Sequence, residues 1–385
     1  MTLKGIWNKD YNHRKHQGKE DAGPKARCLA GGLLLAAALA LQLLARNVSW
    51  FGEWYGVHIY PILVQVFGGF FGLFPFSVVE LGMYVFAAGS LGYGGFWIWR
   101  GIRRNFSQAL RQIGSGAFLL LGVLAFLYTI NCGINYYRTP FSAYLDLELE
   151  GFSQEELEQL CKFLKGQLEA AAREVMEEQG SLEPDEALCQ ALPGQAREDM
   201  KKLAERYPQL AAAYPRPKPV AVSRILSVQS LSGVYSPFTI EANYNRDMTP
   251  YNIPHTACHE LSHLTGFMRE EEANFIGYLA CTDSNASYSR YSGYAAGFIY
   301  GNNALFGQNP QLAAELHAAL LPEIQEDFRK NNEFWAQYEG KISEASTKLN
   351  DTYLKANSQA EGVKSYGRMV DLMLAYYRKS FPENP

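Results

Sequence analysis

The chain has 385 residues, of which 48% are hydrophobic and 19% are charged, and its formal net charge is −4 at pH 7. This charge balance, without a basic stripe of interleaved aromatic residues, gives no reason to expect nucleic acid as a partner. The six cysteines are scattered and form no CxxC pair. A cysteine zinc site or a disulfide framework is therefore not expected.

Three apolar segments in the first third of the chain predict transmembrane helices. They cover residues 28–45, 78–99 and 115–132. Each approaches the ~20 residues that a helix needs to cross ~30 Å of hydrocarbon. A further apolar stretch, residues 57–74, is interrupted by Pro61 and several glycines and is followed by Pro75. We interpret this stretch as interfacial or re-entrant.

Lysine and arginine predict the orientation of these spans. Residues 1–27 carry seven of them, the loop between the second and third spans carries four arginines, and residues 47–99 carry none. Because positive charge accumulates on the cytoplasmic side, residues 1–27 form a predicted cytoplasmic N-terminus, and residues 28–138 a transmembrane region in the lipid bilayer. Residues 139–385 are then extracytoplasmic. A fourth span at 57–74 would place them inside instead.

Residues 139–385 have the composition of a soluble domain. Ser153 with Glu156 forms a capping-box pattern, which opens a helix that runs to about residue 178. A second helix is expected over about residues 195–214, strands over 220–227 and 234–244, and mostly helix beyond 253. The predicted fold class is α+β, with an N-terminal bundle of three transmembrane helices followed by a mostly helical domain with a small β-sheet.

The segment HELSH, residues 259–263, carries the candidate chemistry. His259 and His263 are four residues apart, so on a helix they share one face. Both imidazoles could then bind one tetrahedral Zn²⁺. Glu260 lies beside the first ligand, where it could take a proton from activated water and deliver it to a leaving amine.

A catalytic zinc also needs a third protein ligand, and an acidic run follows the HELSH helix. Glu270 and Asn274 are four residues apart and share a face, so Asn274 could bind the outer nitrogen of a ligating histidine. Glu270 is the favoured ligand, Glu272 the second choice and Glu271 the third. The alternative for the latter two is a solvated first turn that complements the helix dipole.

Other polar side chains near this segment are weaker candidates. His255 lies on the same face but ~12 Å along the helix from His263, so it is expected to cap the helix, face the substrate or be structural. A zinc hydrolase often needs a hydrogen-bond donor aimed at the developing oxyanion. Four side chains could supply it, namely Tyr288, Arg290, Tyr291 and Tyr294. For each of them, a place in the core or on the surface is the favoured alternative. The predicted strand at 234–244 could bind an extended peptide along its edge.

Residues 259–281 read HELSHLTGFMREEEANFIGYLAC. This stretch resembles a family of bacterial multi-span membrane proteins with a zincin-like external domain and no assigned function. The resemblance extends to GVYSPFTIEAN (233–243), RYSGY (290–294), YLKAN (353–357) and GVKSY (362–366).

More distantly, HExxH followed by ExxAN resembles gluzincin peptidases, including the HtpX-like, CAAX-processing and ImmA-like peptidases. That resemblance implies a zincin-like domain and Glu270 as third ligand. Many gluzincins have Asp where this chain has Asn274, so the ligand histidine would be tuned differently.

The sequence thus predicts a membrane-anchored, zinc-dependent metallopeptidase of the bacterial cell membrane. It would hydrolyse peptide bonds of a peptide or protein at the outer face of the membrane. Two alternatives remain open: a non-enzymatic envelope sensor or scaffold that retains a zincin fold, and an amidase that acts on cell-wall peptides.

Overall fold

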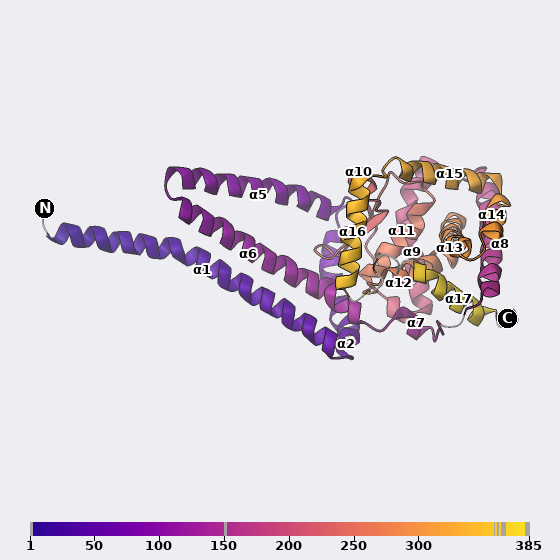
Figure 1. Ribbon diagram of the computed structural model, residues 1–385, viewed down its shortest axis with the longest axis horizontal. Coiled ribbons are helices and arrows are strands. Elements are labelled where there is room, and N and C mark those ends of the chain that lie inside the picture. Colours follow the sequence, from indigo (N-terminus) through magenta and orange to yellow (C-terminus); the bar gives the residue numbers. More distant parts are fainter. Residues whose placement is uncertain (1–2, 150–151, 358, 360–361, 363–366, 382–385) are drawn as a thin grey trace. The chain divides into compact units, whose positions relative to one another are not determined.

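The computed structural model describes residues 3–149, 152–357, 359, 362 and 367–381 (Figure 1), with side chains from residue 23 onward. Residues 1–2 of the basic N-terminus and most of the GVKSY motif therefore lie outside the described residues. Contacts divide the chain into two compact units. The first comprises residues 1–48 and 80–134, and the second comprises residues 49–79 and 135–385.

The first unit is built from three long helices. These are α1 (Leu3–Asn47), α5 (Val78–Arg103, whose first two residues count with the second unit) and α6 (Phe106–Asn131). Two glycines let α1 and α6 touch. A Cβ atom on Gly122 would lie only 2.7 Å from the backbone oxygen of Gly31. Such close contacts between small residues are typical of helices that pack within a membrane.

Two helical stretches of this unit are long and apolar enough to cross a membrane, namely Gly23–Asn47 and Phe106–Asn131. The prediction of three spans is corrected here, because among the described residues the second predicted segment, residues 78–99, does not meet this measure. It does form most of α5. Its five glycines, one serine and two tyrosines dilute the hydropathy that its aliphatic residues supply.

The second unit is mostly helical with a three-stranded sheet in the order β1-β3-β2, which confirms the α+β class. β1 (Lys218–Pro219) runs parallel to β3 (Glu241–Tyr244), and β2 (Gly233–Ser236) runs antiparallel to β3. The single strand predicted over 234–244 is a hairpin, because the chain turns between the two strands and Ile240 has φ 51°.

The strand predicted over 220–227 is also wrong. Residues Arg224–Ser227 form the short helix α10 instead. The parallel strand β1 ends just before it, at Pro219.

The helices of the second unit begin and end close to their local signals. Ser153 accepts a hydrogen bond from the Glu156 N–H while Glu156 accepts one from Ser153, so the predicted capping box is confirmed. The helix predicted from 195 begins earlier, after the cap Asp185. The longer helices are α8 (Gln154–Gln179), α9 (Glu186–Arg206), α11 (Asn252–Leu264), α12 (Glu270–Thr282), α13 (Ser287–Phe306), α14 (Pro310–Ala318), α15 (Pro322–Ala336), α16 (Lys341–Ala356) and α17 (Met369–Ser380).

Helix α11 forms the centre of this unit. It contacts α9, α12, α13 and the strands β2 and β3, and nearly all its side chains are buried. Gly277 of α12 permits the close approach of the two helices, because a Cβ atom there would lie 3.2 Å from both the His255 carbonyl oxygen and the His259 nitrogen. The helix that carries the candidate chemistry is therefore held from several sides.

Candidate metal centre

Three side-chain atoms converge where α11 meets the start of α12. The Nε2 atoms of His259 and His263 are 3.1 Å apart. Glu270 Oε2 lies 3.2 Å from His259 Nε2 and 3.7 Å from His263 Nε2. Ligand atoms around a tetrahedral zinc, each at ~2.0–2.1 Å from the metal, are roughly 3.3 Å apart. The three atoms thus have the spacing that one small cation requires.

The outer nitrogen of each histidine is held by an oxygen atom. His259 Nδ1 lies 2.8 Å from Asn274 Oδ1, and His263 Nδ1 lies 2.9 Å from the Phe267 carbonyl oxygen. Because both partners are acceptors, each histidine donates through Nδ1–H, so Nε2 is the nitrogen that a metal ion would bind in place of a proton. This arrangement orients both rings as metal-ligating histidines are usually oriented.

The electrostatics of the cluster favour a cation. Burial opposes the charge of Glu270, yet the neighbouring His263 and His259 hold the pKa of its carboxyl well below the ordinary value. Burial also opposes the charge of His263, but the Glu270 carboxylate raises the pKa of that imidazole to about 9. Buried Glu270 therefore stays ionised, and its negative charge keeps His263 protonated. A metal ion bound between them would replace that positive charge.

Glu260 lies beside these three groups and is buried. Its candidate ligand atom and those of His259 and His263 all lie within 4.8 Å of one another. Its Oε2 atom has no hydrogen-bond partner among the described residues. Burial raises the pKa of this carboxyl to about 7, although both histidines act to lower it. A buried carboxyl with an unused oxygen beside a cation site can exchange protons with a bound molecule.

Strand β2 forms one wall of the site. The sequence predicts this segment as an edge for a peptide, but it does not predict that Gly233 and Tyr235 contact the residues of the site. A Cβ atom on Gly233 would lie 2.5 Å from Glu260 Oε1, so the strand can approach the carboxyl only because this residue is glycine. The Tyr235 ring lies next to the His263 ring, with 6.2 Å between centroids. Gly233 is visible in the sequence as a glycine before a predicted strand. Its contact with Glu260 depends on residues far apart in the chain, so the local sequence does not predict it.

Tyr300 of α13 is a second side chain that sequence reasoning missed. Burial raises the pKa of its hydroxyl to about 12, and the Glu270 carboxylate adds to the rise. The residue follows the ligand helix at a distance along the chain, in a helix with several tyrosines. No local pattern distinguishes it from its neighbours.

The other acidic candidates face different partners. Glu272 Oε1 accepts a hydrogen bond of 2.9 Å from the Phe141 N–H and lies 3.6 Å from Arg269 Nη1. Glu271 accepts one of 2.7 Å from Gln359. Of the three glutamates in this turn, the structure brings Glu270 to the histidines.

The remaining candidates are also engaged elsewhere. His255 Nε2 donates to the Asn274 carbonyl oxygen at 3.1 Å, which makes it a contact between α11 and α12. The Tyr291 hydroxyl donates to Asp327 at 2.8 Å. Arg290 donates to the Ser284 carbonyl oxygen and forms an ion pair with Glu174 of α8.

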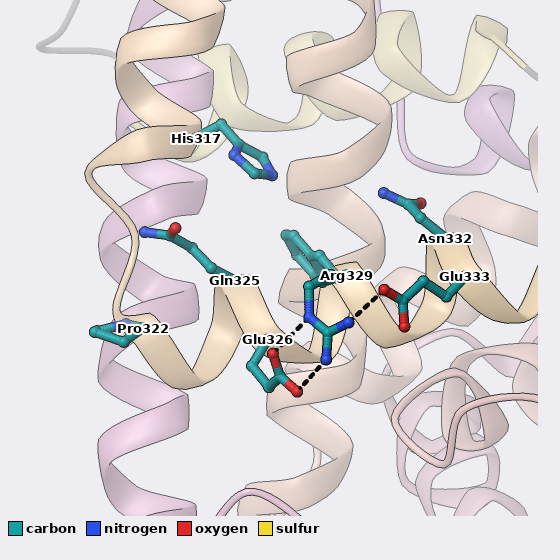
Figure 2. Close-up of a pocket in the computed structure, with 8 residues that line it drawn as sticks. His317, Pro322, Gln325, Glu326, Arg329, Asn332 and Glu333 are labelled. Carbon is teal, nitrogen blue, oxygen red and sulfur yellow. Dashed lines mark hydrogen bonds and ion pairs between the residues drawn. The ribbon is translucent and has the colours of Figure 1, made fainter.

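A cavity of about 540 Å³ lies away from these residues, on α14 and α15. Figure 2 shows His317 and the side chains of α15 around it, with the Arg329 guanidinium bonded to both Glu326 and Glu333. None of the residues that line this cavity belongs to the candidate metal centre.

Comparison with known proteins gives one match. The model of a family described as "Protein of unknown function (DUF3810)" matches residues 55–374. Neither a curated protein nor a solved structure shows significant similarity to the chain. The matched range includes the whole of α11 and α12 and hence every residue of the candidate metal centre. Since it covers most of the sequence, the chain belongs to this family of proteins of unknown function, DUF3810.

Proposed function

We propose that this protein is a membrane-anchored, zinc-dependent metallopeptidase that hydrolyses peptide bonds at the outer face of the membrane. One observation carries the proposal. His259 Nε2, His263 Nε2 and Glu270 Oε2 converge within 3.1–3.7 Å, and the unpartnered carboxylate oxygen of Glu260 lies beside them.

The donor set fits zinc. Two imidazoles and one carboxylate from a helix pair are a known ligand set for catalytic zinc, which leaves a fourth position for water or substrate. When bound there, zinc would supply Lewis-acid chemistry by polarising a carbonyl group and making water a better nucleophile. The hydrogen bonds from Nδ1 of both histidines leave each Nε2 available for this role.

Glu260 is the proposed general base and acid. Burial raises the pKa of Glu260, which makes this carboxyl a better proton acceptor than an exposed glutamate. It would take a proton from the attacking water and deliver it to the leaving amine. This use explains why a buried carboxyl keeps one oxygen without a protein partner, which a purely structural scaffold would not need.

Strand β2 is the proposed support for an extended substrate. In the described sheet it pairs with β3 on one side, so its other edge can accept a peptide backbone. The HExxH and ExxAN helices beside a small sheet also support a zincin-like domain of the gluzincin type. An amidase of cell-wall peptides would use the same residues, so the substrate distinguishes the two.

The proposed location follows from charge. The two candidate spans anchor the protein in a membrane. We take α5 as a third crossing, although residues 78–99 are less apolar than the two candidate spans, because arginines stand at its end. An odd number of crossings then places the candidate metal centre outside the cytoplasm.

The test uses the full-length protein, purified with lipid and incubated with a peptide library that is read by mass spectrometry. Wild type should bind about one zinc per chain and cleave peptides. Glu260→Gln should keep the zinc and lose roughly 10²–10⁴-fold in cleavage rate. A folded wild-type protein that binds no zinc, or a Glu260→Gln variant that cleaves like wild type, would overturn the proposal.

A further inference from the structure

Residues 50–74 form a nearly continuous helical segment that belongs to the second unit. It consists of α2 (Phe51–His58), α3 (Tyr60–Leu63), a π-helical turn (Val64–Gly68) and α4 (Gly69–Gly72). A soluble domain normally turns one apolar face of such a helix inward and a polar face to water. This segment does not follow that rule.

One face of the segment packs on the rest of the second unit through every fourth residue. A Cβ atom on Gly56 would lie 2.9 Å from Arg138 Cδ, and one on Gly72 would lie 2.9 Å from Pro215 Cβ. Glycine therefore lets the helix lie directly on its neighbours. The full packing row is Gly52, Gly56, Tyr60, Val64, Gly68 and Gly72.

A repeat of four residues does not match an ordinary α-helix, in which each step of four turns the row by about 40°. The π turn at Val64–Gly68 winds less per residue and so reduces this drift. It keeps the later glycines on the same side as the earlier ones. The segment is thus shaped to lie along the unit over its whole length.

The opposite face is mostly apolar and exposed, and it also carries one histidine, His58, whose ring stacks on Trp54. Trp50 is 63% exposed, Val66 58% and Leu73 79%. We call this face the apolar strip, and its members are Trp50, Trp54, Ile62, Val66, Phe70 and Leu73. The one carboxylate of the segment, Glu53, is turned toward Arg138, which lies 3.5 Å away, and toward the Thr139 N–H. The exposed face therefore carries no carboxylate, lysine or arginine, and His58 is its one ionisable side chain among the described residues.

We propose that the apolar strip inserts into the lipid bilayer. The position of the segment in the chain supports insertion into lipid. The candidate span Gly23–Asn47 ends three residues before Trp50, and α5 begins at Val78. Aromatic residues such as Trp50 and Trp54 are enriched where a protein passes from lipid to water. A protein partner would be expected to meet a polar rim around the apolar contact, and residues 47–99 contain no lysine or arginine to form one.

The strip is also coupled to the metal centre. Tyr60, from the packing row, shares a hydrogen bond of 2.8 Å with the Tyr235 hydroxyl of β2, and the Tyr235 ring lies beside His263. Arg138, against which Gly56 packs, donates to the Thr265 carbonyl oxygen at 2.8 Å and lies over the Phe267 ring. The Phe267 carbonyl oxygen in turn orients His263.

These contacts between the segment and the candidate metal centre also indicate a substrate class. This inference rests on the proposed function. A peptidase whose site is fixed to a lipid-inserted helix works at the surface of the bilayer. Its substrates would be polypeptides that are themselves held in or on the membrane.

The test measures the surroundings of the strip without any need for activity. A nitroxide spin label is placed at Val66→Cys or Phe70→Cys in the full-length protein, in a background of Cys28→Ser and Cys189→Ser. The control label replaces Glu183, whose side chain is 76% exposed and far along the chain. The proteins are reconstituted into phosphatidylcholine and phosphatidylglycerol vesicles, and collisions with oxygen and with a water-soluble nickel complex are compared.

Oxygen concentrates in lipid and the nickel complex in water. We expect the ratio of oxygen to nickel accessibility at positions 66 and 70 to exceed that at 183 by at least about threefold. A ratio equal to that of the control would show a water-exposed strip and overturn the proposal. Low accessibility to both reagents would show that protein, such as a second copy of the chain, covers the strip, and this too would overturn it. Either failure leaves the zinc and cleavage results of the proposed function untouched.

Discussion

The candidate metal centre and the cavity beside α15 are built from the same residue types but pair them differently. Each combines histidine with two glutamates, yet in the cavity Arg329 neutralises both Glu326 and Glu333 in contact with water. In the metal centre the glutamates face histidines and are buried. In the cavity, arginine neutralises both carboxylates. In the candidate metal centre, one carboxylate oxygen has no hydrogen-bond partner among the described residues.

The largest effect is expected when a proposed zinc ligand is removed, because the cavity has no such ligand to lose. Glu270→Ala should weaken zinc binding by more than about 100-fold, beyond the loss that outer contacts cause. Glu272→Ala should leave zinc affinity nearly unchanged, because that carboxylate accepts from Phe141 instead. Titration with a zinc-selective chelator measures both, with Arg329→Ala as a control in the cavity. If Glu272→Ala lost the metal while Glu270→Ala kept it, the ligand assignment would be wrong.

A smaller effect is expected from the residue that orients His259. Asn274→Ala removes the oxygen at 2.8 Å from His259 Nδ1, and loss of such a contact typically costs about 10- to 100-fold in metal affinity. The same titration measures it. Asn332→Ala, which removes the same side chain from the cavity, is the matched control and should bind zinc like wild type. Equal affinities of all three proteins would argue against the role of Asn274.

Gly233 tests how closely the strand is fitted to the site. Gly233→Ala would place a Cβ atom 2.5 Å from Glu260 Oε1 and 2.9 Å from the backbone oxygen of Asn243. We expect the free energy of unfolding to fall by about 1–2 kcal/mol, as in other overpacked interiors. Gly194→Ala is the control, because a Cβ atom there meets nothing within 4 Å and its helix α9 should gain stability. Thermal unfolding that ranks the two variants in the opposite order would contradict this fit.

The smallest effect concerns Asp327, on the same helix as the cavity. Burial raises the pKa of its carboxyl. An acid whose pKa is higher in the folded state than in the unfolded state destabilises the fold as pH rises through that interval. Asp327→Asn keeps an acceptor for the Tyr291 hydroxyl and removes the charge. Its melting temperature should exceed that of wild type by a few degrees near neutral pH, and the gain should vanish below about pH 4.

This pH dependence would show that the raised pKa of Asp327 affects the stability of the fold, whereas the raised pKa of Glu260 is proposed to serve a reaction. Metal-free wild type and variant are compared by calorimetry at both pH values. A gain that persists in acid would mean that lost charge is not its cause.

The parts of the site that sequence reasoning placed correctly depend on local geometry. The spacing of His259 and His263 is a property of one helix, and the pairing of Glu270 with Asn274 is a property of the next. The capping box at Ser153 is equally local. In each case a few neighbouring residues determine which side chains share a face.

The parts that were missed depend on contacts between distant segments. The position of Gly233 against Glu260 and the turn that divides residues 234–244 into two strands follow from the register of the sheet. The second predicted span, residues 78–99, was predicted from its apolar residues, while its glycines reduce the mean hydropathy. The glycines of residues 57–74 were interpreted as interruptions of the apolar stretch. In the structure Gly68 and Gly72 lie on its packing face, whereas a Cβ atom on Gly69 would meet nothing within 4 Å.

The second unit is discontinuous in sequence, and this determines how it must be produced for study. A fragment cut at residue 139 would omit Arg138, Tyr60 and Glu53, which hold the turn behind His263 and the start of the unit. The shortest expression unit that retains these supports joins residues 49–79 to residues 135–385. Such a protein would still need a detergent or lipid disc for its apolar strip, so preparation in plain buffer is expected to give aggregated material without an intact site.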